Sequence, residues 1–407
     1  MKLFLFNPEN DLALANADPN FIPPLSARTM AADLDVLPMW WAGEGDAVWV
    51  SAPERAEAFM QDAGTIAPRV DWYDGQVMPA VGEFCPWGWN PMLLHALRKH
   101  GFEKELLPSD ERMAVLRALS GRQTAVTLLN DFRRDVADGF EGETPVWCGE
   151  SFYCTGEEEI VGLLRKYPET LLKAPWSGSG KGLRLGRGGW QPPLSGWCRN
   201  LLARQGAVVV EPLYEKKVDL AMEFYSDGAG AVRYAGLSLF ATTEQGAYRS
   251  SRVASEEVKR AHLRRWVTDA VYRKVQSFLT ERLTVLVGSV YKGFLGVDMM
   301  VCRAPGRGGY CLHPCVEVNL RMTMGMVSVF LERYLPEGVE AEFGIAYSSQ
   351  PDRLRMEAGR RRAEHPLRVT AGRIADGYCP LTPVDGQTRY HAWLQVVVSP
   401  GARTAVI

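Results

Sequence analysis

A glycine-rich loop between two strand-like runs is the feature that most constrains this chain. Gly178, Gly180 and Gly182 stand on alternate positions, with Lys173 before them and Lys181 among them. Because glycines carry no side chain, the backbone N–H groups of such a loop can approach an anion closely, and the lysines add positive charge. The loop therefore predicts a phosphate-binding turn. A glycine-rich hairpin without a ligand is the alternative that the loop alone leaves open.

The loop differs from two common phosphate-binding motifs. A Walker A loop would have a glycine in place of Pro175, and a Ser or Thr for magnesium in place of Gly182. A protein kinase has its lysine after the glycine loop and H-R-D and D-F-G motifs later in the chain. Here Lys173 precedes the loop and neither motif follows. The sequence thus excludes both classes.

A second motif is a pair of alternating runs separated by a turn rich in proline and glycine. This pattern predicts a β-hairpin. If Arg303 faces Tyr310, then Asp298 lies opposite Cys315 and diagonally next to Glu317. A slip of one residue would turn Asp298 to the other face of the sheet, so the register decides what the hairpin can bind.

In this register Asp298, Glu317 and Asn319 share one face of the hairpin. Oxygen ligands gathered from two strands suit a hard, partly hydrated ion such as Mg²⁺ that accompanies nucleotide phosphates. We therefore expect a magnesium site. Acidic side chains that simply face solvent are the alternative.

Taken in order, a lysine before a glycine-rich loop, a later aspartate and a Glu-x-Asn-x-Arg sequence resemble the motifs of the ATP-grasp superfamily. The resemblance covers residues 120–321. It implies an α/β (α+β) ATP-grasp fold with three units. These are an amino-terminal parallel-sheet domain at residues 1–118, a small lid subdomain at residues 119–212, and a strand-rich carboxyl-terminal domain with the metal site at residues 213–407.

The resemblance also implies roles for single residues. Lys173 is expected to contact the phosphate oxygens of ATP, and the magnesium ligands are expected to be Asp298, Glu317 and Asn319. A mobile flap over the triphosphate is expected from Ser177, Gly178, Ser179, Gly180 and Lys181. The catalytic groups implied are Lys173, Lys181 and Arg321.

An apolar run between the two motifs leads to Glu211 and Leu213. It is similar to the hinge strand that presents backbone groups to adenine in this superfamily. Asp219 resembles the acid that bonds the ribose hydroxyls. Arg122 matches a basic residue at a helix start near the phosphates. A solvated strand-end acid is the alternative for Glu211, and a solvated helix face is the alternative for Arg122. Arg321 matches an arginine that orients a carboxylate, a task that suits a planar guanidinium with parallel donors.

These assignments imply an ATP- and Mg²⁺-dependent ligase. Such an enzyme activates a carboxylate as an acyl phosphate and joins it to an amine, with release of ADP and phosphate. No Ser-His or Cys-His nucleophile arrangement is visible, and phosphoryl transfer needs mainly positioning and positive charge. Two alternatives stay open: a kinase of the same fold that phosphorylates a small-molecule hydroxyl, and a nucleotide-binding regulatory protein without turnover.

Composition limits the partners. The 407 residues carry 46 Lys+Arg and 48 Asp+Glu, and this net charge of -2 gives no overall field toward nucleic acid or an anionic membrane. No apolar stretch is long enough for a membrane span or a signal segment. The eight cysteines include no C-x-x-C pair, as in a protein of a reducing compartment. We expect a cytoplasmic enzyme with carboxylate and amine substrates and no nucleic-acid or membrane partner, and a homodimer is the default assembly.

The coarse pattern predicts several elements. Apolar runs at residues 2–6, 36–41 and 46–50 predict parallel strands in the amino-terminal domain. Single amphipathic helices are expected at residues 109–129 and 255–283.

The polar run from Asn7 to Asp11 directly follows the first predicted strand, at the edge where open α/β sheets bind ligands. It predicts either a contact to an amine or hydroxyl group of a substrate or a capped helix start.

Overall fold

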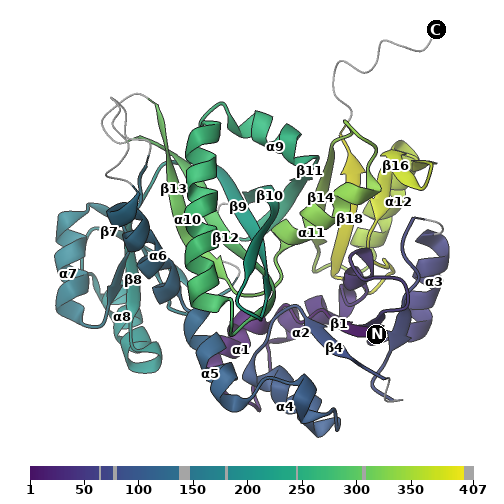
Figure 1. Ribbon diagram of the computed structural model, residues 1–407, viewed down its shortest axis with the longest axis horizontal. Helices are drawn as coiled ribbons and strands as arrows, with labels where there is room; N and C mark the ends of the chain where they lie inside the picture. Colours follow the sequence, from purple (N-terminus) through teal and green to yellow (C-terminus); the bar gives the residue numbers. More distant parts are fainter. Residues whose placement is uncertain are drawn as a thin grey trace.

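The computed structural model describes residues 1–63, 66–76, 80–136, 147–178, 182–243, 246–304 and 309–397. Three main β-sheets with helices packed against them make up this part of the chain (Figure 1). In that view the small sheet lies at the left, the eight-stranded sheet runs from the centre to the right, and the amino-terminal sheet lies below it. Within these residues, every helix is too short or too polar to cross a membrane.

The amino-terminal sheet is parallel, as the sequence predicts, with the strand order β3-β2-β1-β4. Its strands are β1 (Lys2–Leu5), β2 (Ala47–Trp49), β3 (Asp71–Tyr73) and β4 (Glu83–Pro86). The helices beside it are α1 (Asn10–Asn16), α2 (Leu25–Asp33), α3 (Pro53–Ala63) and α4 (Pro91–Lys99).

The apolar run at residues 36–41 is not a strand, so this prediction is wrong. Leu37–Trp40 form a short 3₁₀ helix, η1. Pro38 explains the difference, because proline lacks the N–H that a ladder needs and its ring fixes φ in the helical range. The helix is still buried, and the Trp40 indole donates a hydrogen bond to the Leu381 carbonyl at 2.7 Å.

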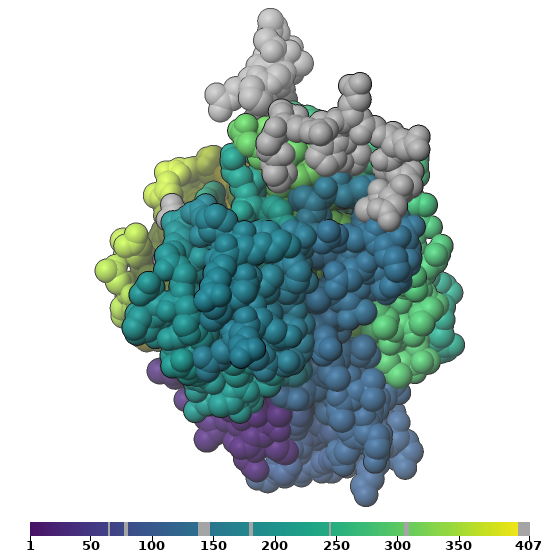
Figure 2. Space-filling view, turned by 90° about the vertical axis from the view of Figure 1, so that its left-hand side faces the viewer, coloured from purple at the N-terminus to yellow at the C-terminus, as the bar shows by residue number. Residues whose placement is uncertain are grey.

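The small sheet is antiparallel, with the order β5-β8-β6-β7. Its strands are β5 (Phe152–Cys154), β6 (Glu169–Lys173), β7 (Leu183–Arg187) and β8 (Val208–Pro212), and its helices are α7 (Glu157–Lys166) and α8 (Pro192–Gln205). Both helices and the sheet contribute to an apolar cluster of their own. In Figure 2 the teal surface of this unit borders the purple surface of the amino-terminal segment.

The large sheet has the order β13-β12-β9-β10-β11-β14-β18-β17. Its strands are β9 (Lys216–Asp227), β10 (Val232–Thr242), β11 (Tyr248–Val253), β12 (Lys292–Arg303), β13 (Tyr310–Asn319), β14 (Ala341–Tyr347), β17 (Tyr378–Pro380) and β18 (Tyr390–Val396). Further elements of this region are α11 (Met324–Leu331), η4 (Glu332–Tyr334), α12 (Arg353–Glu364), and the two-stranded sheet of β15 (Arg368–Thr370) and β16 (Arg373–Asp376).

The helix predicted at residues 109–129 is two helices. Gly121 takes an extended conformation and separates α5 (Asp110–Leu119) from α6 (Arg122–Asp135). Glycine is a good residue for this position because it costs little in an extended cap. The break places Arg122 on the first turn of α6.

The helix predicted at residues 255–283 is also broken. The first part is α9 (Glu256–Leu263) and the second is α10 (Asp269–Val287). Thr268 begins the second part, because its side chain accepts a hydrogen bond from the Val271 N–H at 3.3 Å and so caps the new helix.

The β12–β13 hairpin begins in the expected register and leaves it halfway. Arg303 pairs with Tyr310 as predicted, but the pairing shifts before Asp298. Asp298 lies directly opposite Glu317, and the predicted diagonal relation is wrong. The shift occurs around Pro314, which cannot donate to the ladder, and because it amounts to two positions the expected residues keep the same face.

Helix α6 is fixed by a core that it shares with the large sheet. Leu128, Leu129 and Phe132 are at most 1% exposed, and the helix packs against β13. The Phe132 ring meets Trp147 and Phe278 edge to face, with centroids 4.7 and 5.1 Å apart. This packing holds the first turn of α6 in place.

We expect Phe132→Ala to lower the free energy of unfolding by about 3–5 kcal/mol, because it removes a buried ring and leaves a cavity. Chemical denaturation measures the loss. Val285→Ala on α10 is the control, since Val285 is 79% exposed and its truncation should change stability by less than about 0.5 kcal/mol. An equally small effect of both substitutions would contradict the packing described.

Candidate active site

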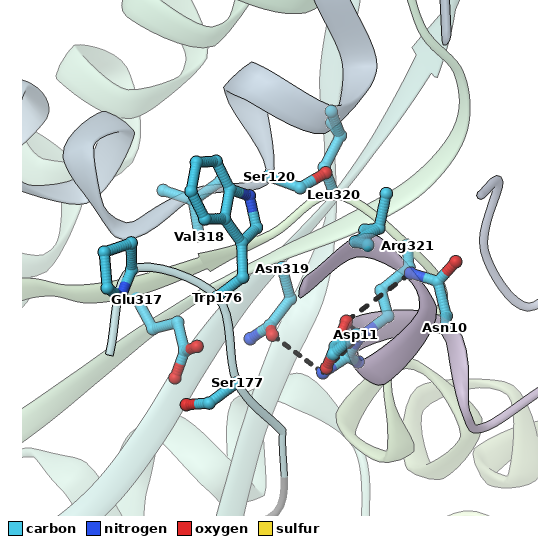
Figure 3. A pocket seen from close by; sticks show the side chains of 12 residues that line it. Asn10, Asp11, Ser120, Trp176, Ser177, Glu317, Val318, Asn319, Leu320 and Arg321 are labelled. Carbon is cyan, nitrogen blue, oxygen red and sulfur yellow. Dashed lines mark hydrogen bonds and ion pairs between the residues drawn. The ribbon is translucent and has the colours of Figure 1, made fainter. Parts of the chain in front are cut away.

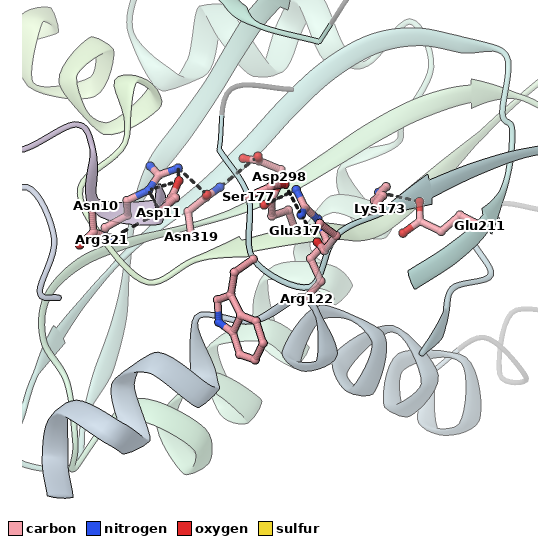
Figure 4. A network of polar contacts seen from close by, with 12 residues as sticks. Asn10, Asp11, Arg122, Lys173, Ser177, Glu211, Asp298, Glu317, Asn319 and Arg321 are labelled. Carbon is pink, nitrogen blue, oxygen red and sulfur yellow. Dashed lines mark hydrogen bonds and ion pairs between the residues drawn. The ribbon is translucent and has the colours of Figure 1, made fainter. Parts of the chain in front are cut away.

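A row of polar side chains crosses the space between the small sheet, helix α6 and the β12–β13 hairpin (Figure 4). Lys173 is the last residue of β6, and Glu211 lies beside it on β8. Glu317 and Asn319 come from the end of β13. The ends of separate elements thus bring together residues that are far apart in the sequence.

Lys173 and Glu211 form a buried ion pair. Lys173 Nζ lies 2.6 Å from Glu211 Oε2, and the two residues are 4% and 3% exposed. Ser151 Oγ donates a hydrogen bond of 2.9 Å to the other Glu211 oxygen. Glu211 is therefore not a solvated strand-end acid: it compensates the charge of Lys173, which desolvation would otherwise disfavour.

Arg122 connects the start of the glycine-rich loop to the hairpin. Its Nη1 donates to the Ala174 carbonyl at 2.5 Å and to Ser177 Oγ at 2.8 Å, while Nη2 donates to Glu317 Oε1 at 2.9 Å. The residue is 7% exposed. Arg122 is thus a buried bridge in this site, and the solvated helix face is excluded for it.

Asp298 and Glu317 place two carboxyl groups on directly paired residues. Burial and the negative charge of Glu317 raise the pKa of the Asp298 carboxyl to about 7. Asn319 Nδ2 donates to Asp298 Oδ2 at 3.0 Å. Within the described residues no cluster of three or more His, Cys, Asp or Glu side chains forms a cation site. The two carboxylates fit a hard, hydrated divalent cation that would relieve the repulsion between them, whereas the Asn319 oxygen accepts a hydrogen bond from Arg321.

Arg321 pairs with an acid from the amino-terminal domain. Its Nε and Nη2 donate to Asp11, with Nη2 to Asp11 Oδ2 at 2.8 Å. Nη2 also donates to Asn319 Oδ1 at 2.9 Å. Figure 3 shows these groups beside a pocket whose lining includes Trp176 and Ser177.

The start of the glycine-rich loop has a tight geometry. The Ala174 N–H donates to the Gly182 carbonyl at 2.8 Å, and any side chain at Gly182 would overlap Ser177. A glycine is therefore required where the loop returns to β7. Ser179, Gly180 and Lys181 lie outside the described residues.

Two other predicted nucleotide contacts have protein partners. The Leu213 N–H donates to the Glu169 carbonyl at 2.9 Å, which extends the ladder between β8 and β6. Asp219 accepts from Lys216 Nζ at 2.6 Å and from Thr242 Oγ1 at 3.1 Å. Leu213 directly follows β8 and Asp219 lies on β9, and their roles in nucleotide binding remain expectations.

The sequence indicated the run from Asn7 to Asp11 but did not single out Asp11. The run from Asn7 to Asp11 is a helix start, since α1 begins at Asn10. The Asn7 amide donates to the Gly88 carbonyl at 2.8 Å and so fixes this segment next to the loop after β4. The position of the run after the first strand was the available signal, but nothing local indicated a partner 310 residues away.

Comparison with solved structures shows that the chain has the ATP-grasp fold. Biotin carboxylase from Campylobacter jejuni, in a beta-gamma-ATP complex, is similar with a TM-score of 0.51 and 10% identity over 97% of this chain and 87% of that chain.

The biotin carboxylase domain of 2-oxoglutarate carboxylase from Hydrogenobacter thermophilus, in a complex with MgADP, ADP and bicarbonate, is similar with a TM-score of 0.52 and 12% identity over 98% and 86% of the two chains. No protein-family model matches the chain, and no curated protein matches it in sequence. At these identities the likeness establishes the fold.

We expect Asp298→Asn to stabilise the metal-free protein at pH 8. The pKa of Asp298 rises from its ordinary 3.8 to about 7 in the fold, so the folded state keeps a proton that the unfolded state releases. The resulting penalty begins as the pH rises above about 4 and is complete above about 7.

Removal of this penalty should add about 2 kcal/mol to the free energy of unfolding at pH 8, half of the full linkage value because the residue is partly exposed. Near pH 4 the gain should vanish. Urea unfolding at both pH values measures the difference. A gain that is equal at the two pH values would contradict the raised pKa.

Proposed function

We propose that this protein is an ATP- and Mg²⁺-dependent ligase that activates a carboxylate as an acyl phosphate and joins it to an amine, with release of ADP and phosphate. The observation that carries the proposal is the convergence of Lys173, Arg122 and the Asp298–Glu317 pair at the start of the glycine-rich loop. Cations and oxygen ligands in one place are what a triphosphate with its metal requires.

Each group has a distinct role in this proposal. Lys173 and Arg122 would neutralise phosphate oxygens, and the residues that would hold Mg²⁺ are Asp298, Glu317 and Asn319. Bound magnesium would supply further positive charge against the phosphoryl group. The nucleotide would also contact Ser177, Gly178, Ser179, Gly180, Lys181, Glu211, Leu213 and Asp219, and the proposed catalytic groups are Lys173, Lys181 and Arg321.

The proposed reaction fits the chemistry available next to the phosphate site. Phosphoryl transfer depends on positioning and on stabilisation of developing charge, and the guanidinium groups of Arg122 and Arg321 can provide both. The Arg321 pocket lies beside Glu317, where a carboxylate could approach a γ-phosphate. The Hydrogenobacter protein is described with MgADP and bicarbonate, so a similar fold there combines a nucleotide with a small carboxylate-like anion.

We expect Glu317→Gln to lower kcat by at least about 100-fold, because it removes a proposed metal ligand but keeps an oxygen for Arg122. The assay is ADP and phosphate release from Mg-ATP with pooled amino acids, small carboxylates and amines. Release should require both an acid and an amine. Glu337→Gln, an exposed glutamate in the same part of the chain, is the matched control and should leave turnover unchanged.

Three results would each contradict a different part of the proposal. A phosphorylated product without any need for an amine would identify a kinase. Nucleotide binding without turnover would identify a non-catalytic binding protein. Full activity of Glu317→Gln would remove the metal assignment.

A further inference from the structure

The Arg321 guanidinium donates hydrogen bonds to Asp11, Asn319 and Met322. Its Nε and Nη2 face the carboxylate of Asp11, Nη2 also meets Asn319 Oδ1, and Nη1 donates to the Met322 carbonyl at 3.1 Å. The edge formed by Nε and Nη2 is the one that binds a carboxylate with two parallel hydrogen bonds. In this structure Asp11 occupies that edge.

Asp11 reaches Arg321 from the amino-terminal domain. It lies in the first turn of α1, where the helix dipole favours a negative charge. The side chains of Asp11 and Arg321 are 24% and 19% exposed, and both line the pocket next to the glycine-rich loop (Figure 3). A dissolved anion could therefore reach the pair from the pocket.

Asp11 also touches the glycine-rich loop. A Cβ atom on Gly178 would lie 3.2 Å from both Cβ and Oδ2 of Asp11, so a larger residue at this position would crowd the Asp11 side chain. One carboxylate thus contacts Arg321 of the hairpin region and the first glycine of the loop. Movement of Asp11 would change both contacts.

We propose that Asp11 is an internal occupant of a carboxylate subsite on Arg321, and that the carboxylate of the incoming substrate displaces it. The identity of the ligand rests on the proposed ligase function. The geometry gives the reason: two carboxylates cannot share one guanidinium edge, and Asp11 presents the group that the substrate would present. Arrival of the substrate would then release Asp11 from Arg321 and from Gly178 together.

The need to displace Asp11 lowers the apparent affinity of Arg321 for an external anion. If Asp11 vacates the subsite for a tenth of the time or less, the apparent affinity of Arg321 for an external anion is at least about tenfold weaker than its intrinsic affinity. Asp11→Asn keeps the shape of the side chain but removes its charge. The variant should therefore bind an anion that the wild-type protein binds poorly.

The test is isothermal titration with inorganic phosphate as the probe, in the absence of nucleotide. We expect Asp11→Asn to bind phosphate at least about tenfold more tightly than the wild-type protein. The gain should disappear in the double variant Asp11→Asn with Arg321→Met. Asp11→Glu, which retains a carboxylate, should bind phosphate no better than the wild-type protein, and Asp18→Asn, an exposed aspartate beyond the same helix, is the charge-matched control.

Equal phosphate affinity of the wild-type protein and Asp11→Asn would overturn the proposal, as would a gain that survives loss of Arg321. Thermal unfolding of each variant verifies that the binding protein is folded. The titration requires no turnover, so its result is independent of the ligase assay. Gain of binding in a protein without ligase activity would keep the anion subsite and reject only the identity of its natural ligand.

Discussion

The charge balance between two guanidinium groups and three carboxylates is the interaction on which the candidate site depends. Arg122 compensates Glu317, and Arg321 compensates Asp11. Asp298 has an amide as its hydrogen-bond partner and a raised pKa, and among the described residues it is the acid of this group that forms no ion pair. A buried carboxyl in this state favours either a proton or a metal ion. Among these described groups, carboxylates outnumber guanidinium groups by one, and a bound cation would balance the charge.

The fold brings these charges together from helix α1, helix α6 and the region of the β12–β13 hairpin. Arg122 begins α6, whose buried face is anchored on the large sheet, while the loop it contacts belongs to the small sheet. Asp11 adds a contribution from the amino-terminal domain. Because Asp11, Arg122 and the hairpin residues come from different parts of the fold, a relative movement of these parts would alter the pairing.

Much of this could be predicted from the sequence, because the signals are local. The glycine spacing indicated the loop, and the alternation around residues 304–309 indicated a hairpin with Asp298, Glu317 and Asn319 on one face. The direct opposition of Asp298 and Glu317 could not be predicted, because it depends on an interruption of the ladder around Pro314.

Contacts between residues far apart in the sequence could not be predicted either. The sequence indicated Arg122 as a basic residue near the phosphates but not its partner, because the break at Gly121 and the packing of α6 turn it toward Glu317. Asp11 and Arg321 are 310 residues apart, and no periodicity relates them. Burial, likewise, decides that Glu211 is a partner of Lys173 and not a surface acid. Tertiary packing supplies these relations, so a local pattern cannot contain them.

The most direct test of the site is a crystal structure of the protein with Mg²⁺ and a non-hydrolysable ATP analogue. We expect the triphosphate to lie against Lys173 and Arg122, with the metal bound by the carboxylates of Asp298 and Glu317. A nucleotide bound away from the glycine-rich loop, or a metal held by other side chains, would contradict the proposed site.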